Sequence, residues 1–387
     1  MAAPLKRRET VTHVTVAVLA VLAAVAYTLS LPEVRYGEVS LPLQFRYKYL
    51  EESYRPEWAS WADVGSYPST AFIKGVPWIS YEKPYCASTC LQMVAYKYGV
   101  NASVAYLNFL MGFTYSAYYG EFDEQAFFTP FNDPLAGYVN ASRLLGLKYH
   151  LLVMNDEELF TSLCRYLVSK DIPVILPINA SRLYGEGLFT PHFELLVGYD
   201  EQSFYLYEPT GPARFTLGAR GLKLPVPLIV QAVNDFCRGF QLPWKYALIY
   251  FTGSARLPAS LAEVLERNGL LELGSNYTLG SYRIFLGSRA IRALAERLER
   301  GELGPRDVAW QLKCAALTRL DNAKFLRSNF PQSEAIVRAS EHLEEAARLY
   351  EEALHLINAS SKVAELLREA AQHEAEAGEL MIAASRA

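Results

Sequence analysis

The pattern of apolar positions is most informative in residues 75–99, where an aromatic, turn-like segment runs into Cys86 and a helical repeat follows. Apolar residues then recur at intervals of three and four, which predicts an amphipathic helix that carries Leu91, Val94, Ala95 and Tyr98 on one side and ends at Gly99. Cys86 would stand at the N-terminus of this helix, where free N–H groups and the helix dipole stabilise a thiolate. Cys86 is therefore a candidate nucleophile, although a small buried cysteine that begins a helix fits the same pattern.

A second pattern consists of two apolar runs separated by a tight turn. Residues 192–199 and 203–207 are predicted to form the strands of a hairpin. His192 would begin the first strand and Glu208 would follow the second, so the hairpin would place them at the same end. A carboxylate there fixes the tautomer of an imidazole, and the imidazole can serve a thiol as base. Glu194 shares the strand face of His192, as a substrate contact or a buried partner.

The rest of the segment between residues 75 and 256 alternates helical and strand periodicity. Helices are expected at 133–145, 156–169 and 225–237, and strands at 148–153, 173–177 and 245–251. A helix that carries the cysteine, followed by a sheet that carries the histidine and the acid, is an α+β arrangement. Residues 32–74 are rich in Tyr, Trp and Pro and show little periodicity, which indicates a linker that packs on this core.

From about residue 257 the composition changes, because Gly and Pro become rare and Ala, Leu, Glu and Arg dominate. Four amphipathic helices are predicted, at 283–300, 305–320, 332–357 and 361–384. Each has an apolar stripe that must be buried, so we expect antiparallel helices packed on one another and on the preceding domain. The sequence thus predicts an all-α domain over 257–387, which shapes substrate access or mediates self-association.

The N-terminus carries a basic cluster at residues 6–8 before an uncharged run at 11–31. This run is just long enough to span a bilayer as one transmembrane helix, with the body of the protein outside the cell membrane. The small residues 24–26 also resemble a signal-peptidase site, in which case the protein would be secreted. The expected domains are therefore a membrane anchor or signal over 1–31, the linker over 32–74, an α+β domain over 75–256 and the helical domain over 257–387.

Two residue counts bear on an extracellular location. Five N-x-S/T sequons are candidates for glycosylation: Asn101, Asn140, Asn179, Asn276 and Asn358. The five cysteines fit two disulfides plus one free thiol, with Cys86 the candidate for the free position, and they equally fit a chain in which all are reduced.

Charge and motifs exclude several function classes. The net charge of −4 provides no basic surface for nucleic acid. The chain has no P-loop, no dinucleotide fingerprint and no HExxH motif, so no cofactor is expected. Cys86 and Cys90 have no second close Cys or His pair for zinc. Glu352 and His355 match one half of a di-iron helix motif, but Glu369 and His373 are four apart, so we expect a charged helix surface and no metal.

Taken together, the cysteine helix and the H-x-x-x-x-V-G-Y-D strand that runs on to Glu208-Pro209 resemble papain-fold peptidases. The resemblance covers roughly residues 70–255 and is to the double-glycine leader peptidases of bacteriocin exporters and their stand-alone relatives. It implies a papain-like core in which Cys86 is the nucleophile, His192 the base and Glu208 the residue that orients the base. His150 and Asp200 are the alternative base and orienting acid.

The sequence departs from those peptidases around the cysteine. They usually have Gly-Pro after it and a glutamine five or six residues before it, which donates to the oxyanion. Here Ala87-Ser88 follow Cys86, and Tyr81 and Ser80 occupy the earlier places, so Tyr81 is the oxyanion candidate.

The C-A-S-T motif at 86–89 and the aromatic stretch at 109–120 resemble instead the N-terminal domain of butirosin biosynthesis protein H. That family transfers an acyl group from a carrier protein to an amine.

The predicted function is a membrane-tethered, extracytoplasmic thiol enzyme that acts on an acyl or peptide bond. The membrane segment favours a peptidase, because acyl carrier proteins are cytoplasmic, whereas the C-A-S-T motif and the helical tail favour an acyltransferase. A papain-like domain that has lost its chemistry and binds peptide is the third hypothesis. The expected partners are a peptide or acyl-bearing substrate and the membrane, with no nucleic acid.

Overall fold

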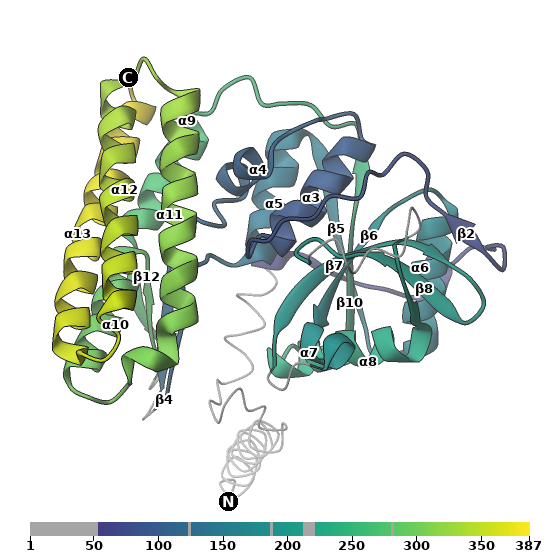
Figure 1. The fold of residues 1–387 in the computed structure, drawn as a ribbon. Helices are drawn as coiled ribbons and strands as arrows, with labels where there is room; N and C mark the ends of the chain where they lie inside the picture. The colour runs from purple at the N-terminus through teal and green to yellow at the C-terminus, as the bar shows by residue number, and fades with distance from the viewer. Residues whose placement is uncertain (1–52, 123–124, 186–188, 212–220, 280–281) are drawn as a thin grey trace, which may run out of the picture.

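The structure is a computed structural model of the 387-residue chain, and it describes residues 53–122, 125–185, 189–211, 221–279 and 282–387. Figure 1 shows two parts side by side. One part is a large mixed sheet with helices on both faces, and the other is an array of long helices with a small sheet beside it.

Helix α3 (Cys86–Lys97) begins at the predicted cysteine. It runs through the core as a nearly continuous buried segment from Ala87 to Ala95 and packs against β7 (Pro191–Tyr199). Helix α4 (Val104–Met111) follows after a Ser103 N-cap and ends at Gly112, whose positive φ of 68° closes the helix. The cysteine therefore lies at the point where the chain enters the centre of the first part.

The large sheet has the strand order β1-β5-β10-β6-β7-β8-β9, with β2 paired to β7. Strand β1 pairs parallel to β5, and the other neighbours along this path are antiparallel. Beside β7, its strands are β1 (Pro56–Trp58), β2 (Ala71–Phe72), β5 (Leu147–Met154), β6 (Val174–Asn179), β8 (Ser203–Tyr207), β9 (Leu222–Pro225) and β10 (Tyr246–Gly253). The predicted linker thus contributes strands at both the edge and the β7 side of this sheet.

Alternation along β10 shows how the two faces are covered. Tyr246 stacks on Phe160 of α6 (Glu157–Ser169), whereas Phe251 contacts Tyr138 of α5 (Pro134–Leu145) on the opposite face. Helix α8 (Val226–Gly239) packs with α6, and α3 packs with α5. The short helix α7 (Ala180–Tyr184) follows β6 directly. The predicted helices and strands of this part lie within a few residues of these bounds.

The C-terminal part contains α9 (Ala262–Leu273), α10 (Ser288–Glu299), α11 (Ala309–Asn329), α12 (Glu334–His355) and α13 (Ser360–Ser385). Short 3₁₀ turns lie at Trp61–Asp63 and Pro305–Val308.

The prediction of an all-α tail is wrong in one respect, because β11 (Asn276–Leu279) and β12 (Tyr282–Leu286) form a hairpin. This hairpin pairs with β3 (Tyr118–Phe122) and β4 (Gln125–Thr129), which come from the middle of the first part. Segments far apart in sequence therefore share one small sheet.

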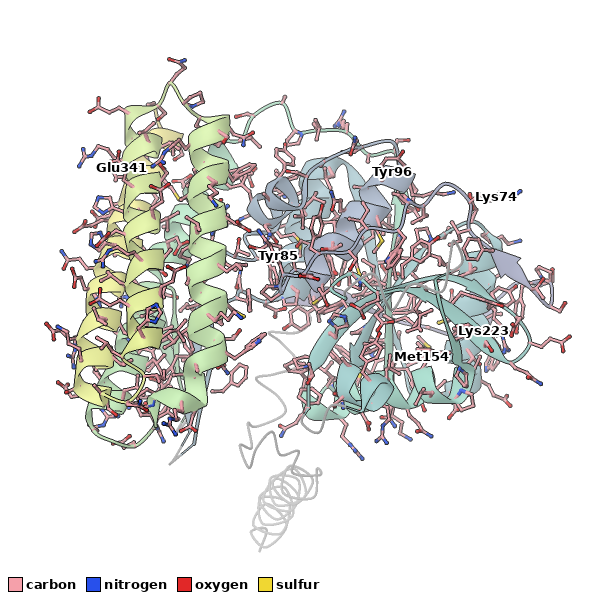
Figure 2. The ribbon with its side chains drawn as sticks, in the orientation of Figure 1. Lys74, Tyr85, Tyr96, Met154, Lys223 and Glu341 are labelled. Atoms are coloured by element: carbon pink, nitrogen blue, oxygen red, sulfur yellow. The ribbon has the colours of Figure 1, made fainter. Side chains whose placement is uncertain are left out.

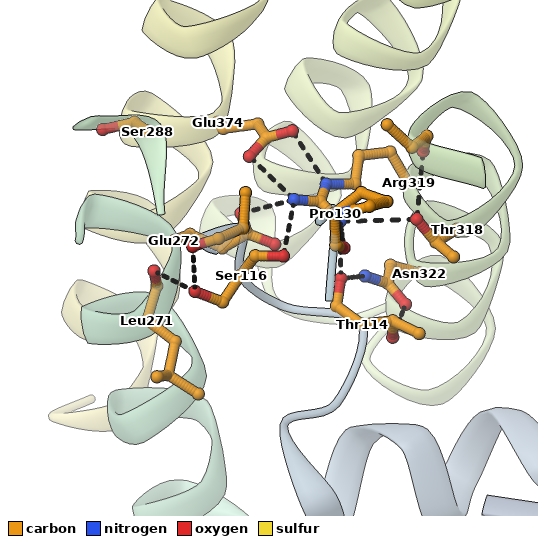
Figure 3. A network of polar contacts seen from close by, with 12 residues as sticks. Thr114, Ser116, Pro130, Leu271, Glu272, Ser288, Thr318, Arg319, Asn322 and Glu374 are labelled. Atoms are coloured by element: carbon orange, nitrogen blue, oxygen red, sulfur yellow. Dashed lines mark hydrogen bonds and ion pairs between the residues drawn. The ribbon is translucent and has the colours of Figure 1, made fainter. Parts of the chain in front are cut away.

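A buried arginine holds the same two segments together (Figure 3). Arg319 of α11 is fully buried, and its guanidinium pairs with Glu374 of α13 at 2.8 and 3.0 Å. The remaining N–H groups donate to backbone carbonyls of Thr114, Ser116 and Pro130, which flank the β3–β4 hairpin. Because a buried cation must have its donors satisfied, this network fixes α11 against the chain that leaves α4.

No helix in the described residues is long and apolar enough to cross a bilayer. This finding contradicts the predicted single-pass membrane localisation with the body outside. The run at 11–31, on which that prediction rested, lies outside the described residues.

The glycosylation candidates divide by exposure. Asn179 is buried in β6, and its Oδ1 accepts hydrogen bonds from the Thr190 N–H and the Ser181 hydroxyl, an environment that leaves no room for a glycan. Asn140 is half-buried within α5. The other three are exposed, but exposure alone does not indicate a glycan: Asn101, Asn276 and Asn358.

We expect Arg319→Met to lower the free energy of unfolding by about 3–5 kcal/mol, because it leaves the buried Glu374 carboxylate without its cation. Urea unfolding measures this change. The matched control is Arg327→Met on the same helix, which removes a half-exposed pair with Glu344 and should cost no more than about 1 kcal/mol. Equal effects of the two variants would contradict a central role for the Arg319 network.

Candidate functional site

The β7–β8 hairpin brings His192 and Glu208 together. Leu195 pairs with Tyr207 across the hairpin, so His192 near the start of β7 lies beside the residue that follows β8. The His192 Nε2 atom is 2.9 Å from Glu208 Oε1 and 3.1 Å from Oε2. Both side chains are buried. Because a carboxylate only accepts, it fixes Nε2 as the protonated nitrogen and leaves Nδ1 for another partner.

Glu208 accepts hydrogen bonds from three further groups. Thr210 donates its N–H and its hydroxyl to Oε1, at 2.7 and 3.0 Å, and the Tyr184 hydroxyl lies 2.8 Å from Oε2. Burial acts to raise the pKa of this carboxyl, but the charge and hydrogen bonds of His192, with those of Thr210 and Tyr184, lower the pKa to about 2. Glu208 is therefore ionised across the neutral range.

Cys86 completes the group of three. It is half-buried at the first position of α3. Burial alone would lower the pKa of His192, but the charge of Glu208, followed by charge and hydrogen-bond interactions with Cys86, raises that pKa well above its usual value. The structure thus brings together the three residues proposed from the sequence. The first turn of α3 has no side-chain cap, so its backbone N–H groups face the cysteine's surroundings without a capping partner.

The oxyanion candidate Tyr81 is directed elsewhere. Its hydroxyl donates to Gln92 Oε1 at 3.1 Å, and Gln92 lies six positions after Cys86, about 9 Å along the helix. The Tyr81 backbone N–H instead donates to the carbonyl of Pro209 at 3.0 Å. Trp78 Nε1 donates to the carbonyl of Glu208 at 2.9 Å. The segment before α3 therefore holds the end of β8 in place.

Glu194 and Tyr184 extend the site inward. Glu194 is fully buried, and the Tyr184 hydroxyl is 2.5 Å from its Oε1 while also contacting Glu208. One hydroxyl hydrogen cannot serve two carboxylates. Burial, then the charge of Glu208, raises the pKa of Glu194 well above its usual range, which favours its protonated form. If Glu194 is protonated, its O–H can donate to Tyr184, which leaves the Tyr184 hydroxyl hydrogen for Glu208. The sequence analysis left Glu194 open between substrate contact and buried partner, and it missed Tyr184, which carries no motif.

The alternative residues occupy other places. His150 on β5 is separated from β7 by β10 and β6, so the two strands lie about 14 Å apart, and the strand pairing places His150 level with Leu196, four residues from His192 along β7. Its ring stacks on Tyr250, and its Nδ1 lies 3.4 Å from Glu57. Asp200 lies in the hairpin turn, where its Oδ1 accepts the N–H groups of Gln202 and Ser203. Asp200 therefore shapes the turn at the far end from His192.

The five cysteines are all free, and the four other than Cys86 are buried. Cys90 lies one turn after Cys86 and its thiol donates to the carbonyl of Phe193 at 3.5 Å. Burial raises the pKa of Cys90, Cys164 and Cys237, which makes them poor nucleophiles. Of the two arrangements that the cysteine count allowed, the structure has the one without disulfides.

A cavity of about 350 Å³ lies where the two parts of the molecule meet. Its lining includes Tyr81, Lys83 and Tyr85 from the segment that leads to Cys86, and Asp321 and Phe325 from α11. Tyr85, labelled in Figure 2, donates its hydroxyl to Asp321 at 2.8 Å. The chain beside the cysteine is thus tied to the C-terminal helices.

His192, Glu194 and Glu208 also offer three possible metal donors within 4.8 Å of one another. His192 Nε2 and both Glu208 oxygens already make the hydrogen bonds described above, and the raised pKa of Glu194 disfavours the charged form that would bind a cation. His192 and Glu208 are therefore engaged with each other, whereas the buried Glu194 Oε2 atom has no hydrogen-bond partner among the described residues.

Comparison with known proteins gives the following result. Residues 73–216 match the Peptidase_C39 like family. This range contains the cysteine, the histidine and the glutamate and spans well under half of the chain. One similar solved structure is described as a "putative C39-like peptidase" from Bacillus anthracis, with 18% identity, a TM-score of 0.33, and coverage of 49% of this chain and all of that one. No curated protein matches the sequence.

We expect Glu194→Gln to become progressively more stable than the native protein as pH rises above about 5. A proton held by Glu194 in the folded state and lost on unfolding reduces stability by about 1.4 kcal/mol per pH unit, over the range between the two pKa values. Glutamine keeps the hydrogen bond to Tyr184 and has no such dependence. Urea unfolding of both proteins at several pH values measures the difference.

The control is Glu201→Gln, an exposed residue of the hairpin turn, whose difference from the native protein should show no comparable slope. A stability difference for Glu194→Gln that stays constant with pH would mean that the buried carboxyl is ionised.

Proposed function

We propose that this protein is a cysteine peptidase-like enzyme of papain-like fold, in which Cys86 is the nucleophile, His192 the general base and acid, and Glu208 the orienting carboxylate. The observation that carries the proposal is the buried His192–Glu208 pair, held next to a half-exposed cysteine at a helix N-terminus. The match of residues 73–216 to a peptidase-like family is consistent with it.

In the proposed reaction the Cys86 sulfur attacks the carbonyl carbon of the substrate after His192 has taken the thiol proton at Nδ1. The oxyanion accepts hydrogen bonds from backbone N–H groups in the first turn of α3, because Tyr81 is engaged with Gln92. The imidazolium then gives its proton to the leaving group, and an acyl thioester on Cys86 results. Glu208, hydrogen-bonded to Nε2, stabilises the imidazolium through both steps.

Hydrolysis and acyl transfer share this thioester and differ only in the acceptor that resolves it. The sequence argument for a peptidase rested partly on a membrane location that the structure contradicts. The support that remains for a peptidase is the family match. The acceptor is tested by trapping the thioester with a candidate peptide or acyl substrate and then supplying water alone or an amine. Release of free acid in water alone supports a hydrolase, and turnover only with amine overturns that assignment.

Cys86 should be alkylated by iodoacetamide at pH 7 much faster than the buried cysteines, with peptide mass spectrometry as the measurement. His192→Ala should slow this labelling by at least about tenfold, because the imidazole no longer takes the thiol proton. The matched control is His150→Ala, which removes a histidine of the same sheet and should leave the rate unchanged. Equal labelling of the native protein and His192→Ala would instead indicate a binding module without chemistry.

Glu208→Gln should lower the pKa of His192 by at least about one unit, because the charge that stabilises the imidazolium is lost. The protonated ring would then exist only at lower pH, and any activity that needs it would fall on the alkaline limb of the pH profile at a lower pH than in the native protein. A titration of histidine ¹⁵N chemical shifts measures the pKa directly. Glu208→Asp retains the charge and should shift the pKa less; an unchanged pKa in Glu208→Gln would contradict the assigned role.

A further inference from the structure

A second group of chemically active side chains lies far from Cys86 in the sequence, on the seam between α12 and α13. These two long helices run side by side in Figure 1 and are joined by a short turn. His342 lies thirteen residues before His355, the last residue of α12, and His373 lies thirteen residues after Ser360, the first of α13. In an antiparallel pair these positions face each other across the seam. From the sequence, His373 was expected on a charged helix surface without a metal.

Three donor atoms converge at this point. His342 Nδ1 is 2.9 Å from His373 Nδ1 and 3.0 Å from Glu376 Oε2. The three groups are each partly buried, and their donor atoms all lie within 4.8 Å of one another. Glu376 stands three positions after His373 on α13, so both point from the same helix face.

The spacing of these atoms suits a transition metal. With metal–nitrogen bonds of about 2.0 Å, neighbouring ligand atoms lie about 2.8 Å apart in an octahedral site and about 3.3 Å apart in a tetrahedral one. The observed 2.9 and 3.0 Å fall between these values. The third separation, between His373 Nδ1 and the Glu376 carboxylate, is within 4.8 Å.

Hydrogen bonding alone satisfies this arrangement poorly. Two Nδ1 atoms at 2.9 Å need a hydrogen between them, and His342 Nδ1 also faces a carboxylate oxygen at 3.0 Å. A single N–H on His342 cannot point well at both acceptors. A cation placed among the three atoms accepts a lone pair from each.

The surroundings support a cation as well. Gln372 Nε2 donates to Glu376 Oε1 at 2.9 Å, which leaves Oε2 directed at the histidines. Glu345 and Glu369 place carboxylate oxygens within 4.8 Å of His373. Arg348 pairs with Glu345 at 2.6 Å and offsets part of this negative charge.

We propose that His342, His373 and Glu376 form a site for a divalent transition-metal ion that links α12 to α13. Two imidazoles and one carboxylate favour Zn²⁺, Cu²⁺ or Ni²⁺ over Mg²⁺ and Ca²⁺, which prefer sites made of oxygen ligands alone. Three protein ligands leave at least one coordination position for water or an external ligand. The metal site shares no residue with the Cys86 site, so a test of metal binding is independent of the proposed function.

The test uses the full chain with Cys86→Ser, which removes the thiol as a competing zinc ligand, after dialysis against a chelator. Calorimetric titration with Zn²⁺ should show one site of defined stoichiometry, and thermal unfolding should shift upward with added Zn²⁺ but not with Mg²⁺. His342→Ala and His373→Ala should each weaken binding at least about tenfold and remove the thermal shift. The matched control is His355→Ala, an exposed histidine of the same helix, which should change neither measurement.

Electron paramagnetic resonance with Cu²⁺ distinguishes this site from adventitious surface binding. The spectrum should show coupling to two imidazole nitrogens, and His373→Ala should reduce this to one. Zinc binding that survives the double variant His342→Ala/His373→Ala, or the absence of any stoichiometric binding to the parent protein, would overturn the proposal.

Discussion

The candidate site depends on the buried carboxylate of Glu208, which accepts hydrogen bonds from three surrounding residues. Glu208 receives donors from His192, Thr210 and Tyr184, and its own backbone carbonyl is held by Trp78. Its position is set by the β7–β8 register, because a slip of one residue would turn it to the opposite face of the sheet. Once Glu208 is fixed, the protonated nitrogen of His192 is fixed, and so is the nitrogen left for the thiol. The geometry of the site is therefore a consequence of strand pairing.

A second buried charge, the guanidinium of Arg319, holds the two parts of the molecule in position relative to each other. Arg319 is satisfied only when α11, α13 and the chain around β3 and β4 are all in place. Helix α11 also supplies one wall of the cavity next to Tyr85, so the same contact that fixes the helices fixes the space beside the cysteine. The C-terminal helices are thus structurally coupled to the segment that precedes α3, whatever the substrate is.

Features encoded by neighbouring residues could be predicted from the sequence, whereas features that depend on residues far apart in the chain could not. Helix α3 and the β7–β8 hairpin are encoded by local periodicity and turn residues, so Cys86, His192 and Glu208 could be placed at element ends. The pairing of β12 with β3 joins segments about 160 residues apart in sequence, and no local sequence pattern predicts it. Tyr184 lies on a helix of five residues and acts only through its hydroxyl contacts. Tyr81 was predicted to bind the oxyanion because of its spacing from Cys86, but its hydroxyl donates a hydrogen bond to Gln92.

The raised pKa of Glu194 bears on the charge of the whole site. In the ion-pair form that the proposed mechanism uses, a thiolate, an imidazolium and one carboxylate would give the group a single net negative charge. A second ionised carboxylate, linked to Glu208 through Tyr184, would add another negative charge in a region closed to water, where it would oppose formation of the thiolate. Protonation of Glu194, which its raised pKa favours, would remove that charge and would leave the hydrogen of Tyr184 for Glu208. A single proton would thus order the hydrogen bonds behind His192 and keep the electrostatics of the site compatible with the proposed nucleophile.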